Sequence, residues 1–330
     1  MKIAVIGAGL SGVTLAKELS VRNFDVQIFE KSCRVGGRLS HRILPWGNID
    51  FGAQYFTARD ERFQRQVEKW VAAGVVGVWH FSPHRVAGEK LLRSPDNNTR
   101  YVGLPNMNAI AHAQVQAGNF KVHYEKAVAS LKRDNGKWQL SINNGDERTG
   151  GFDWVISSLP AEQARTLLLD QAISKQIPSH VHSPCWAVAL ATKGKVDFDI
   201  QGIFGDDIVA WVSRQSSKPG CRKDDDYDDL WMVHFSSRWS ELHESAPAEI
   251  VTSEAIGWLA EKLKDHSDGR CSLRYSMQHF WRYAQISDQD IKDQLIVDKK
   301  NGIAQVGAWQ SKGRVEGAYL SAMELLGYYF

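Results

Sequence analysis

The amino-acid sequence predicts an α/β protein with a Rossmann-like dinucleotide-binding unit at its N-terminus and a mixed-sheet α+β region further along the chain. Residues 2–6 form a short apolar run with β-branched members, which is typical of a parallel strand buried on both faces. A glycine-rich segment at 7–12, an apolar helical repeat and a second strand ending at Glu30 complete a βαβ unit. From about residue 174 the pattern changes to strands with short connections, which favours a mixed sheet.

Apolar spacing and turn residues predict the remaining elements. Apolar residues at i, i+4, i+7 and i+8 within 63–71 indicate an amphipathic helix. An Asp-Asn-Gly turn at 134–136 indicates a β-meander. The stretch 77–101 indicates hairpins and loops, and 214–229, with its run of aspartates, indicates a solvated loop. Further helices are predicted at 106–117, 161–169, 248–263 and 314–326, and further strands at 121–124, 127–131, 138–142, 154–159, 186–190, 208–212, 230–235 and 302–307.

Length, composition and charge restrict the class of protein. The 330 residues suggest two domains or one large elaborated domain. The hydrophobic content of 43% excludes a disordered or collagen-like chain. Lys and Arg number 40 against 38 Asp and Glu, and a net charge of +2 lacks the basic excess that would neutralise a run of phosphates. A nucleic acid is therefore not expected as a partner.

The cysteines and the apolar runs indicate the compartment. Four cysteines lie far apart, without the spacing of a disulfide framework or a zinc site: Cys33, Cys185, Cys221 and Cys271. We therefore expect a cytoplasmic protein with no metal site. No apolar run approaches the roughly 18 residues needed to span a bilayer, so that no membrane association is expected.

The first glycine-rich segment has the pattern G-x-G-x-x-G. Gly7 permits a tight turn, Gly9 lets the backbone approach a pyrophosphate, and Gly12 lets the helix pack on the strand. The helix N-terminus, which includes Ser11, offers N–H groups and a positive dipole end to phosphates. Glu30 follows Gly7 by 23 residues, close to the roughly 20 of the fingerprint, and can accept hydrogen bonds from ribose hydroxyls. These residues predict dinucleotide binding.

A second glycine-rich turn favours FAD over NAD. The sequence E-K-x-x-x-x-G-G-R occupies residues 30–38. Backbone at Gly37 can pass near the diphosphate, and Arg38 can donate a charge-assisted hydrogen bond to it. Lys31 belongs to the same motif and is a further candidate. A domain that binds only a nicotinamide dinucleotide does not need this second turn.

The combination of motifs resembles that of the flavin-containing amine oxidases, and of the renalase family in particular. After the two glycine-rich turns comes D-x-G-A-Q-Y-F at 50–56. The similarity continues to the end of the chain, in the blocks 184–190, 279–284 and 313–321. The first two motifs are common to many FAD oxidoreductases, whereas G-A-Q-Y together with the last block is more specific.

The resemblance implies a p-hydroxybenzoate hydroxylase-like architecture, in which FAD-binding and substrate-binding segments alternate along the chain. Residues 1–75, 100–173 and 298–330 would form a discontinuous FAD-binding domain. Residues 76–99 and 174–297 would form the substrate domain. Any single cut of the chain would separate parts of the same site.

The same resemblance implies which further residues contact a non-covalently bound FAD. Val128 would offer its backbone to the adenine, and the helix from Arg314 would point its N-terminus at the flavin pyrimidine edge. This sequence departs from the family at Ala308, where the family has Asp, and Gln310 or Ser311 could take over that role. The other implied cofactor-binding residues are Gln54, Tyr55, Gly307 and Val315.

The reaction implied by the resemblance is oxidation of isomeric dihydronicotinamide dinucleotides, the 2- or 6-dihydro forms of NAD(P). A hydride would pass to flavin N5, and O2 would reoxidise the flavin to give NAD(P)+ and hydrogen peroxide. A flat donor needs aromatic walls, although each ring taken alone is as readily a core residue. The candidate pocket residues are Tyr55, Phe56, Trp186, His234, Trp281 and Tyr283.

Two alternatives remain open from the sequence. A flavin-containing amine oxidase or another FAD dehydrogenase would use the same FAD elements on a different donor. A non-catalytic dinucleotide-binding protein is the second alternative, and the Ala308 departure favours it.

Overall fold

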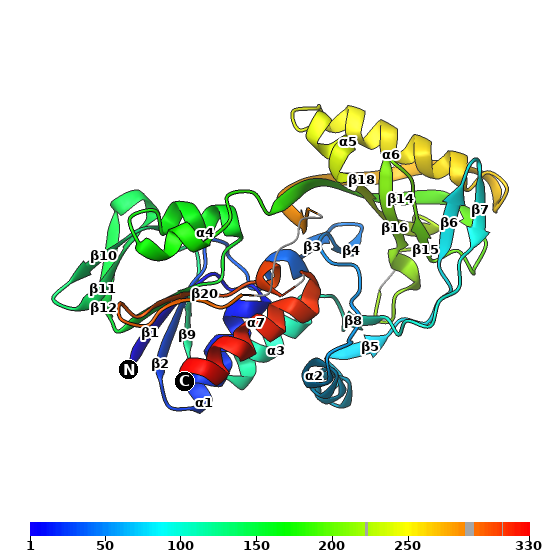
Figure 1. The fold of residues 1–330 in the computed structure, drawn as a ribbon. Helices are drawn as coiled ribbons and strands as arrows, with labels where there is room; N and C mark the ends of the chain where they lie inside the picture. Colours follow the sequence, from blue (N-terminus) through cyan, green and yellow to red (C-terminus); the bar gives the residue numbers. More distant parts are fainter. Residues whose placement is uncertain (222–223, 288–293, 312) are drawn as a thin grey trace.

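A six-stranded sheet forms one half of the molecule (Figure 1). The structure, a computed structural model, describes residues 1–221, 224–287, 294–311 and 313–330. The strand order is β19-β20-β13-β1-β2-β9, parallel except for β19, which runs antiparallel to β20. The strands are β1 (Lys2–Ile6), β2 (Asp25–Phe29), β9 (Lys121–His123), β13 (Trp154–Ser157), β19 (Ile296–Asp298) and β20 (Ile303–Gln305).

Both faces of this sheet are covered, which explains the unbroken apolar run of β1. Ile3 and Val5 belong to one buried cluster, on the side of three neighbouring helices, whereas Ala4 and Ile6 belong to a second cluster on the opposite face. Figure 1 shows the helices below the sheet and a three-stranded sheet with a short helix above it. The helices are α1 (Leu10–Val21), α3 (Ala109–Ala117) and α7 (Arg314–Tyr329); the opposite layer has β10 (Val128–Asp134), β11 (Lys137–Ile142), β12 (Glu147–Phe152) and α4 (Ala161–Leu167).

A seven-stranded sheet forms the other half, in the order β18-β14-β17-β16-β15-β6-β7. It is antiparallel except where β15 pairs with β6. One face is covered by α5 (Ser237–Leu242) and α6 (Ala248–Lys262), and the other contacts the hairpin of β3 (His41–Leu44) and β4 (Gly47–Asp50). The strands are β6 (His84–Ala87), β7 (Lys90–Arg93), β14 (His182–Val196), β15 (Gly202–Phe204), β16 (Val209–Arg214), β17 (Asp229–Phe235) and β18 (Ser267–Ile286).

The connection between the halves includes α2 (Glu61–Ala72) and the pair β5 (Val76–Val78) and β8 (Tyr101–Gly103). Asp60 caps α2 by accepting a hydrogen bond from Arg62 N at 2.8 Å. Single helical turns lie at 37–39, 143–145, 172–176, 215–217 and 308–310.

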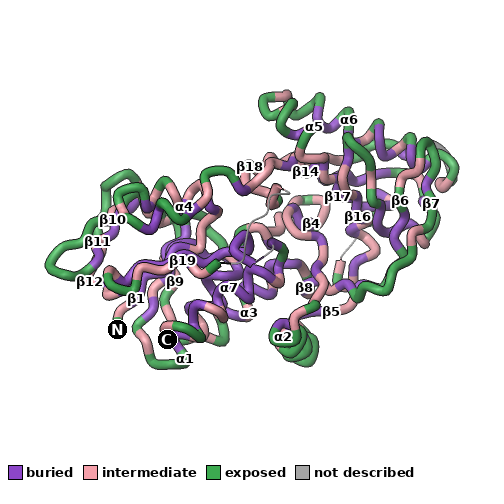
Figure 2. Tube along the Cα trace, in the orientation of Figure 1, coloured by how far each residue is buried: buried purple, intermediate pink, exposed green. Residues whose placement is uncertain are grey.

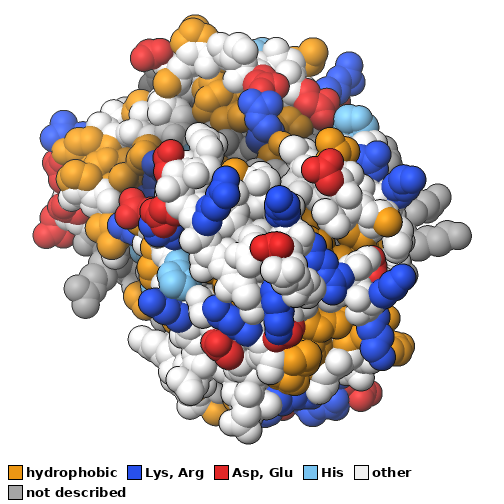
Figure 3. All heavy atoms as spheres, turned by 90° about the vertical axis from the view of Figure 1, so that its left-hand side faces the viewer, with side chains coloured by type: hydrophobic (Ala, Val, Ile, Leu, Met, Phe, Trp, Pro, Cys, Tyr) orange, Lys and Arg blue, Asp and Glu red, His pale blue; other side chains and the backbone are white. Residues whose placement is uncertain are grey.

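Burial follows the layers. Figure 2 shows buried segments along the middle of both sheets, and exposed segments along α2 and the outer parts of β10 and β11. Figure 3 shows positive and negative side chains interspersed on the face that it presents, in keeping with the small net charge. Among the described residues, none of the helices is long and apolar enough to cross a membrane.

The predicted helices and strands are largely confirmed, with shifted ends. The helix predicted at 314–326 continues to Tyr329, and the predicted helix 106–117 begins at Ala109. The strand predicted at 186–190 is the middle of β14, which is three times as long because it pairs with β18 from His182 to Val196. The hairpin within 77–101 is confirmed as β6 and β7.

The segment 214–229 connects β16 to β17, as the loop prediction has it, but several of its described residues are buried rather than solvated. Lys218, Tyr227 and Asp229 are 7%, 1% and 3% exposed. Asp224 and Asp225 are the exposed part of the acidic run. Tyr227 is buried because it packs between the large sheet and the hairpin of β3 and β4, where its Oη donates to Trp46 O at 2.7 Å.

Candidate functional site

The first glycine-rich turn joins β1 to α1 at the carboxyl edge of the parallel sheet. Gly7 has φ +99°, a conformation that favours glycine, and its N–H donates to Phe29 O at 2.9 Å. At Gly12 a Cβ would lie 2.2 Å from Gly7 O, so that the close packing of helix on turn requires glycine there. At Gly9 a Cβ would meet no protein atom within 4 Å. Space therefore remains in front of Gly9, where α1 begins without a side-chain cap, and Ser11 is buried in its first turn.

The second glycine-rich turn lies directly against the first. Gly36 N donates to Ala8 O at 2.9 Å, and the two segments form a parallel bridge between Gly9 and Gly36. Gly36 and Gly37 have φ +119° and +53°, and a Cβ on Gly37 would lie 3.3 Å from Gly9 Cα. The two predicted phosphate-binding turns are thus adjacent in space.

Arg38 extends from this second turn toward the large sheet. Its half-buried side chain donates a single long hydrogen bond among the described residues, 3.4 Å from Nη1 to Ala284 O in β18. Burial lowers the pKa of Arg38, and Glu162 acts in the opposite direction. A guanidinium with donors to spare, next to a glycine turn with open space, fits a diphosphate. The arrangement therefore suits the FAD that the motifs predict.

Glu30 lies at the end of β2, as predicted, and is 8% exposed. Its Oε2 accepts from Ala8 N at 2.7 Å, and its Oε1 accepts from Ser32 N and Ser32 Oγ at 2.9 Å. Lys126 N donates to the backbone carbonyl of Glu30 at 2.8 Å, two residues before β10 begins at Val128. Lys31 is exposed beside it. Glu30 thus also fixes the turn itself, a role that the sequence did not indicate.

The C-terminal segment returns to the same sheet through β20 and a short turn before α7. Gly313 N donates to Ala308 O at 2.8 Å, and both Gly313 and Arg314 have positive φ, +72° and +65°. Gly307 N donates to Ser321 Oγ at 3.1 Å, Val315 is buried, and the Arg314 side chain is exposed.

Two buried amides in this segment have oxygens without a partner among the described residues. They are Gln305 Oε1 and Gln310 Oε1. Gln310 Nε2 donates to Gln294 O at 3.2 Å, and Ala308 is 6% exposed nearby. The Gln310 oxygen is therefore an acceptor that fits the role suggested for it at the Ala308 departure.

The carbonyl of Phe51 joins the D-x-G-A-Q-Y-F motif to the large sheet. It accepts from Trp281 Nε1 of β18 at 3.0 Å and from His234 Nε2 of β17 at 3.2 Å. Burial lowers the pKa of His234 to about 4, so that the ring is neutral at pH 7 and its proton is assigned to Nε2 by the hydrogen bond. The structure thus brings together two of the predicted pocket residues.

His279 and Arg42 are functional candidates that the sequence did not single out. The His279 ring lies 4.5 Å from Trp281, and its Nδ1 is 3.1 Å from Arg42 Nη2. Arg42 only donates, so Nδ1 accepts; burial and the Arg42 charge lower the pKa of His279 to about 4. The signal was present, because His279 lies two residues before Trp281 in a strand and so shares its face.

Tyr55 meets a further ring, Trp211, at a centroid distance of 5.4 Å. The Arg100 guanidinium lies 5.3 Å from the Tyr55 ring and is paired with Asp96. Trp211 Nε1 is buried without a partner among the described residues. Like Trp281, the Tyr55 and Trp211 rings are half-buried, which is typical of residues that line a cavity rather than fill a core.

The prediction that Trp186 and Phe56 line the substrate pocket is wrong. Trp186 donates from Nε1 to His243 O at 2.9 Å and packs on the face covered by α5. Phe56 is 4% exposed, stacks on Tyr101 at 5.6 Å and packs against Phe63 of α2 in the core. In both cases the cause is the alternation of an extended chain, which turns neighbouring side chains to opposite faces. Tyr283 lies on the strand of Trp281, but its ring contacts His182, 6.2 Å away, nearer the six-stranded sheet.

Gln54 belongs to a buried polar network rather than to an open cofactor surface. Its Nε2 donates to Asp50 O and Gly52 O at 2.7 and 2.9 Å. Its Oε1 accepts from Ser213 Oγ at 2.7 Å and from Lys218 Nζ at 3.0 Å. The sequence predicts that Gln54 contacts the cofactor. In the structure its side chain instead forms hydrogen bonds that hold the motif to the large sheet.

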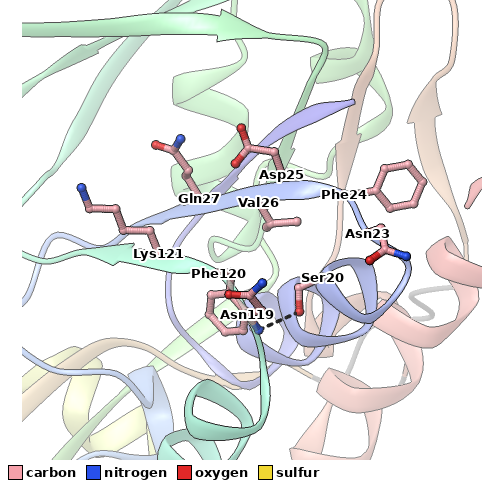
Figure 4. Close-up of a pocket in the computed structure, with 9 residues that line it drawn as sticks. All are labelled: Ser20, Asn23, Phe24, Asp25, Val26, Gln27, Asn119, Phe120 and Lys121. Atoms are coloured by element: carbon pink, nitrogen blue, oxygen red, sulfur yellow. Dashed lines mark hydrogen bonds between the residues drawn. The ribbon is translucent and has the colours of Figure 1, made fainter.

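One surface depression lies away from all the residues described above. Figure 4 shows it between the end of α1 and the first residues of β2 and β9, with Asn119 N donating to Ser20 Oγ at 3.1 Å. Asp25 and Lys121, which begin the two strands, line it. Ligands of open α/β sheets bind at the carboxyl ends of the strands. This depression is at the opposite end and is not the dinucleotide site.

The protein combines a Rossmann-like sheet that carries two adjacent glycine-rich turns with a second sheet whose aromatic rings contact the D-x-G-A-Q-Y-F motif. This combination is that of an FAD-dependent oxidoreductase. Family models match two parts of the chain, an NAD(P)-binding Rossmann-like domain over residues 5–70 and a flavin containing amine oxidoreductase over residues 87–324. The second match covers well over half of the chain. The protein belongs to the flavin-containing amine oxidoreductase family, and its cofactor is FAD.

Similar proteins of known structure share the fold over nearly the whole chain. An oxidoreductase from Methanosarcina mazei is 16% identical with a TM-score of 0.70, covering 99% of this chain and 100% of that one. A redesigned putrescine oxidase is 12% identical with a TM-score of 0.70, covering 99% and 98%. At these identities the likeness shows the fold alone.

Among curated proteins, the chain is similar over short segments to much longer relatives. The bifunctional tRNA 5-methylaminomethyl-2-thiouridine biosynthesis protein of Campylobacter jejuni is 39% identical over 88 residues. The match covers 24% of this chain and 14% of that protein.

Proposed function

We propose that the protein is a renalase-like oxidase of isomeric dihydronicotinamide dinucleotides, the 2- or 6-dihydro forms of NAD(P). Bound FAD would supply hydride acceptance at flavin N5 and electron transfer to O2, so that NAD(P)+ and hydrogen peroxide are the products. The protein would supply a ring-lined surface for the planar donor, cations for its phosphates and exclusion of water.

The observation that carries this proposal is the charge of the aromatic cluster around the Phe51 carbonyl. His234 and His279 are neutral at pH 7 and lie with Trp281 on one face of the large sheet. The charged group bonded to this cluster is Arg42. A cation repels a protonated amine and attracts a phosphate, so that Arg42 favours a dinucleotide over an ammonium substrate.

The proposal includes the p-hydroxybenzoate hydroxylase-like division of the chain. Strands from within 2–29, 121–157 and 296–305 share the six-stranded sheet. The β6–β7 hairpin, which begins at His84, instead joins the edge of the large sheet. These pairings support a discontinuous FAD-binding domain interleaved with a substrate domain.

Stopped-flow reduction tests the reaction. We expect 6-dihydro-NAD to bleach the flavin absorption at about 450 nm rapidly, and ordinary NADH and benzylamine to bleach it slowly. Rapid bleaching by benzylamine would instead identify an amine oxidase. A stable flavin band that none of these donors bleaches would favour the non-catalytic alternative.

Replacing Arg42 with glutamine tests the source of dinucleotide affinity. A charge-assisted hydrogen bond contributes about 1.5–3 kcal/mol, so that KM for the dinucleotide should rise roughly 10- to 100-fold with a smaller change in kcat. The matched control is Arg282→Gln, because Arg282 pairs with Glu244 at 2.6 Å near the helix-covered face. Steady-state kinetics of both variants give the comparison. An unchanged KM in Arg42→Gln would contradict the assignment of Arg42 to the phosphates.

A further inference from the structure

We propose that His182 binds the FAD diphosphate together with Arg38, and that it takes up a proton when it does so. The His182 side chain is 0% exposed, and its Nε2 has no partner among the described residues. Its other nitrogen, Nδ1, is held by Glu162 Oε2 at 2.7 Å. A buried nitrogen with a fixed orientation and no partner costs free energy unless a ligand satisfies it. The inference does not depend on the substrate proposed above.

The position of His182 relative to the glycine-rich turn is set by the start of α4. Ser158, just before this helix, donates from Oγ to Gly7 O at 2.9 Å and to Ile6 O at 3.0 Å. Glu162, in the first turn of the helix, accepts from Val181 N and His182 N at 2.7 and 2.8 Å. The start of β14 is therefore tied, through the first turn of α4, to the glycine-rich turn that is predicted to receive the diphosphate.

Arg38 reaches the same place from the second glycine-rich turn. Its Nη1 bonds to Ala284 O, and β18 at this point pairs with the start of β14, with Gln285 opposite Ser183. Arg38 is close enough to lower the pKa of His182 and to feel the charge of Glu162. Arg38, which has donors to spare and follows the Gly37 turn packed against Gly9, is thus held near the start of β14. Nε2 of His182 carries no proton while Nδ1 donates to Glu162, and it becomes a donor to a diphosphate once it is protonated.

The charges around His182 allow it to change protonation state. Burial and Arg38 lower the pKa of His182, whereas the hydrogen bond to Glu162 raises it. Burial alone would raise the pKa of Glu162, but hydrogen bonds from His182 and the Val181 backbone lower it to about 2, so that this carboxylate stays ionised. From β18, Tyr283 presents its ring at 6.2 Å. Of these neighbours, Arg38 opposes a charge on His182, and Glu162 favours it.

A diphosphate changes this balance. The negative charge of the diphosphate offsets the positive charge of Arg38, and a phosphate oxygen can accept a hydrogen bond from protonated Nε2. The pKa of His182 is therefore higher with FAD bound than without it. Between the two pKa values, binding of FAD takes up a proton. The affinity for FAD therefore rises as the pH falls through this window and levels off below it, with a slope of at most about tenfold per pH unit.

The experiment measures the dissociation constant of FAD from the FAD-loaded protein by flavin fluorescence on dilution, from pH 5 to pH 9. Wild type should bind FAD more tightly at low pH. In His182→Gln the dependence on pH should vanish, and binding at low pH should be about 10- to 100-fold weaker. The matched control is His243→Gln; His243 bonds to Trp239 O at 2.8 Å on the helix-covered face and should keep the wild-type profile.

A second variant separates the charge from the packing. His182→Arg carries a permanent cation and should restore tighter binding than His182→Gln, without dependence on pH. If His182→Gln does not fold, the profiles of wild type and Glu162→Gln decide, since loss of the Glu162 charge should move the window to lower pH. A wild-type affinity that does not vary with pH, or a His182→Gln profile that follows the wild type, overturns the proposal.

Discussion

Gly9→Ala is expected to weaken FAD binding on the order of 10- to 100-fold while leaving the fold of the protein intact. The backbone of Gly9 has φ −69° and ψ 172°, which any residue adopts. An added Cβ would meet no protein atom within 4 Å. The methyl group therefore has room in the protein itself, but it occupies the space in which the backbone approaches a diphosphate. Flavin fluorescence on titration gives the affinity, and circular dichroism of the FAD-free protein reports the fold.

Alanine substitutions at two other glycines serve as controls for Gly9→Ala. In Gly12→Ala the new Cβ would lie 2.2 Å from Gly7 O, a backbone atom, so that both stability and FAD binding should fall. In Gly257→Ala, within α6, the Cβ meets nothing within 4 Å, and the helix should gain up to about 1 kcal/mol with no change in FAD binding. If Gly9→Ala bound FAD as tightly as the wild type, the diphosphate would have to lie elsewhere.

The parts of the site that sequence predicts well are local in the chain. The turn at Gly7, the packing of Gly12 and the position of Glu30 follow from a single βαβ unit, because the strand, turn and helix that fix them are consecutive. The same applies to α7, whose start at Arg314 was predicted from its own residues. A site whose residues lie in one supersecondary unit can be predicted without information about distant contacts.

The aromatic face could not be predicted because its residues come from distant segments. Tyr55 contacts Trp211, and the Phe51 carbonyl reaches Trp281, only after the D-x-G-A-Q-Y-F motif packs on the large sheet. The sequence supports Trp186 and Trp281 equally as pocket residues. Successive side chains of a strand point to opposite faces of the sheet, and the pairing of the strands decides which residues point to which face. Trp186 pairs with Phe280 and faces the helices, whereas Cys185 pairs with Trp281.

Buried charge was the least predictable feature. Lys218 lies in a segment rich in glycine, proline and aspartate, a composition typical of solvated loops. Its burial depends on Asp50, which is 168 residues away and provides the charge that offsets its own. Nothing local in the sequence of either residue indicates that the two meet.

Lys218→Met is expected to destabilise the folded chain strongly, lowering the free energy of unfolding by about 3–5 kcal/mol. Lys218 Nζ lies 3.1 Å from Asp50 Oδ2, and both side chains are 5% exposed. Burial lowers the pKa of Lys218, and Asp50 raises it. Removal of the ammonium leaves a buried carboxylate without its counter-charge, and Gln54 Oε1 loses one donor. Urea unfolding of the FAD-loaded protein measures the loss.

The comparison with other variants shows whether charge or packing is responsible. Lys218→Met combined with Asp50→Asn removes both charges and should recover much of the lost stability, because the main penalty is the unpaired ion. Arg93→Met breaks the exposed pair with Asp199, whose side chains are 71% and 44% exposed, and should cost at most about 1 kcal/mol. If the double variant is as unstable as Lys218→Met, packing rather than charge holds this segment.

If charge is responsible, Lys218→Met should also slow substrate oxidation, because Asp50 is followed directly by Phe51, whose carbonyl orients His234 and Trp281.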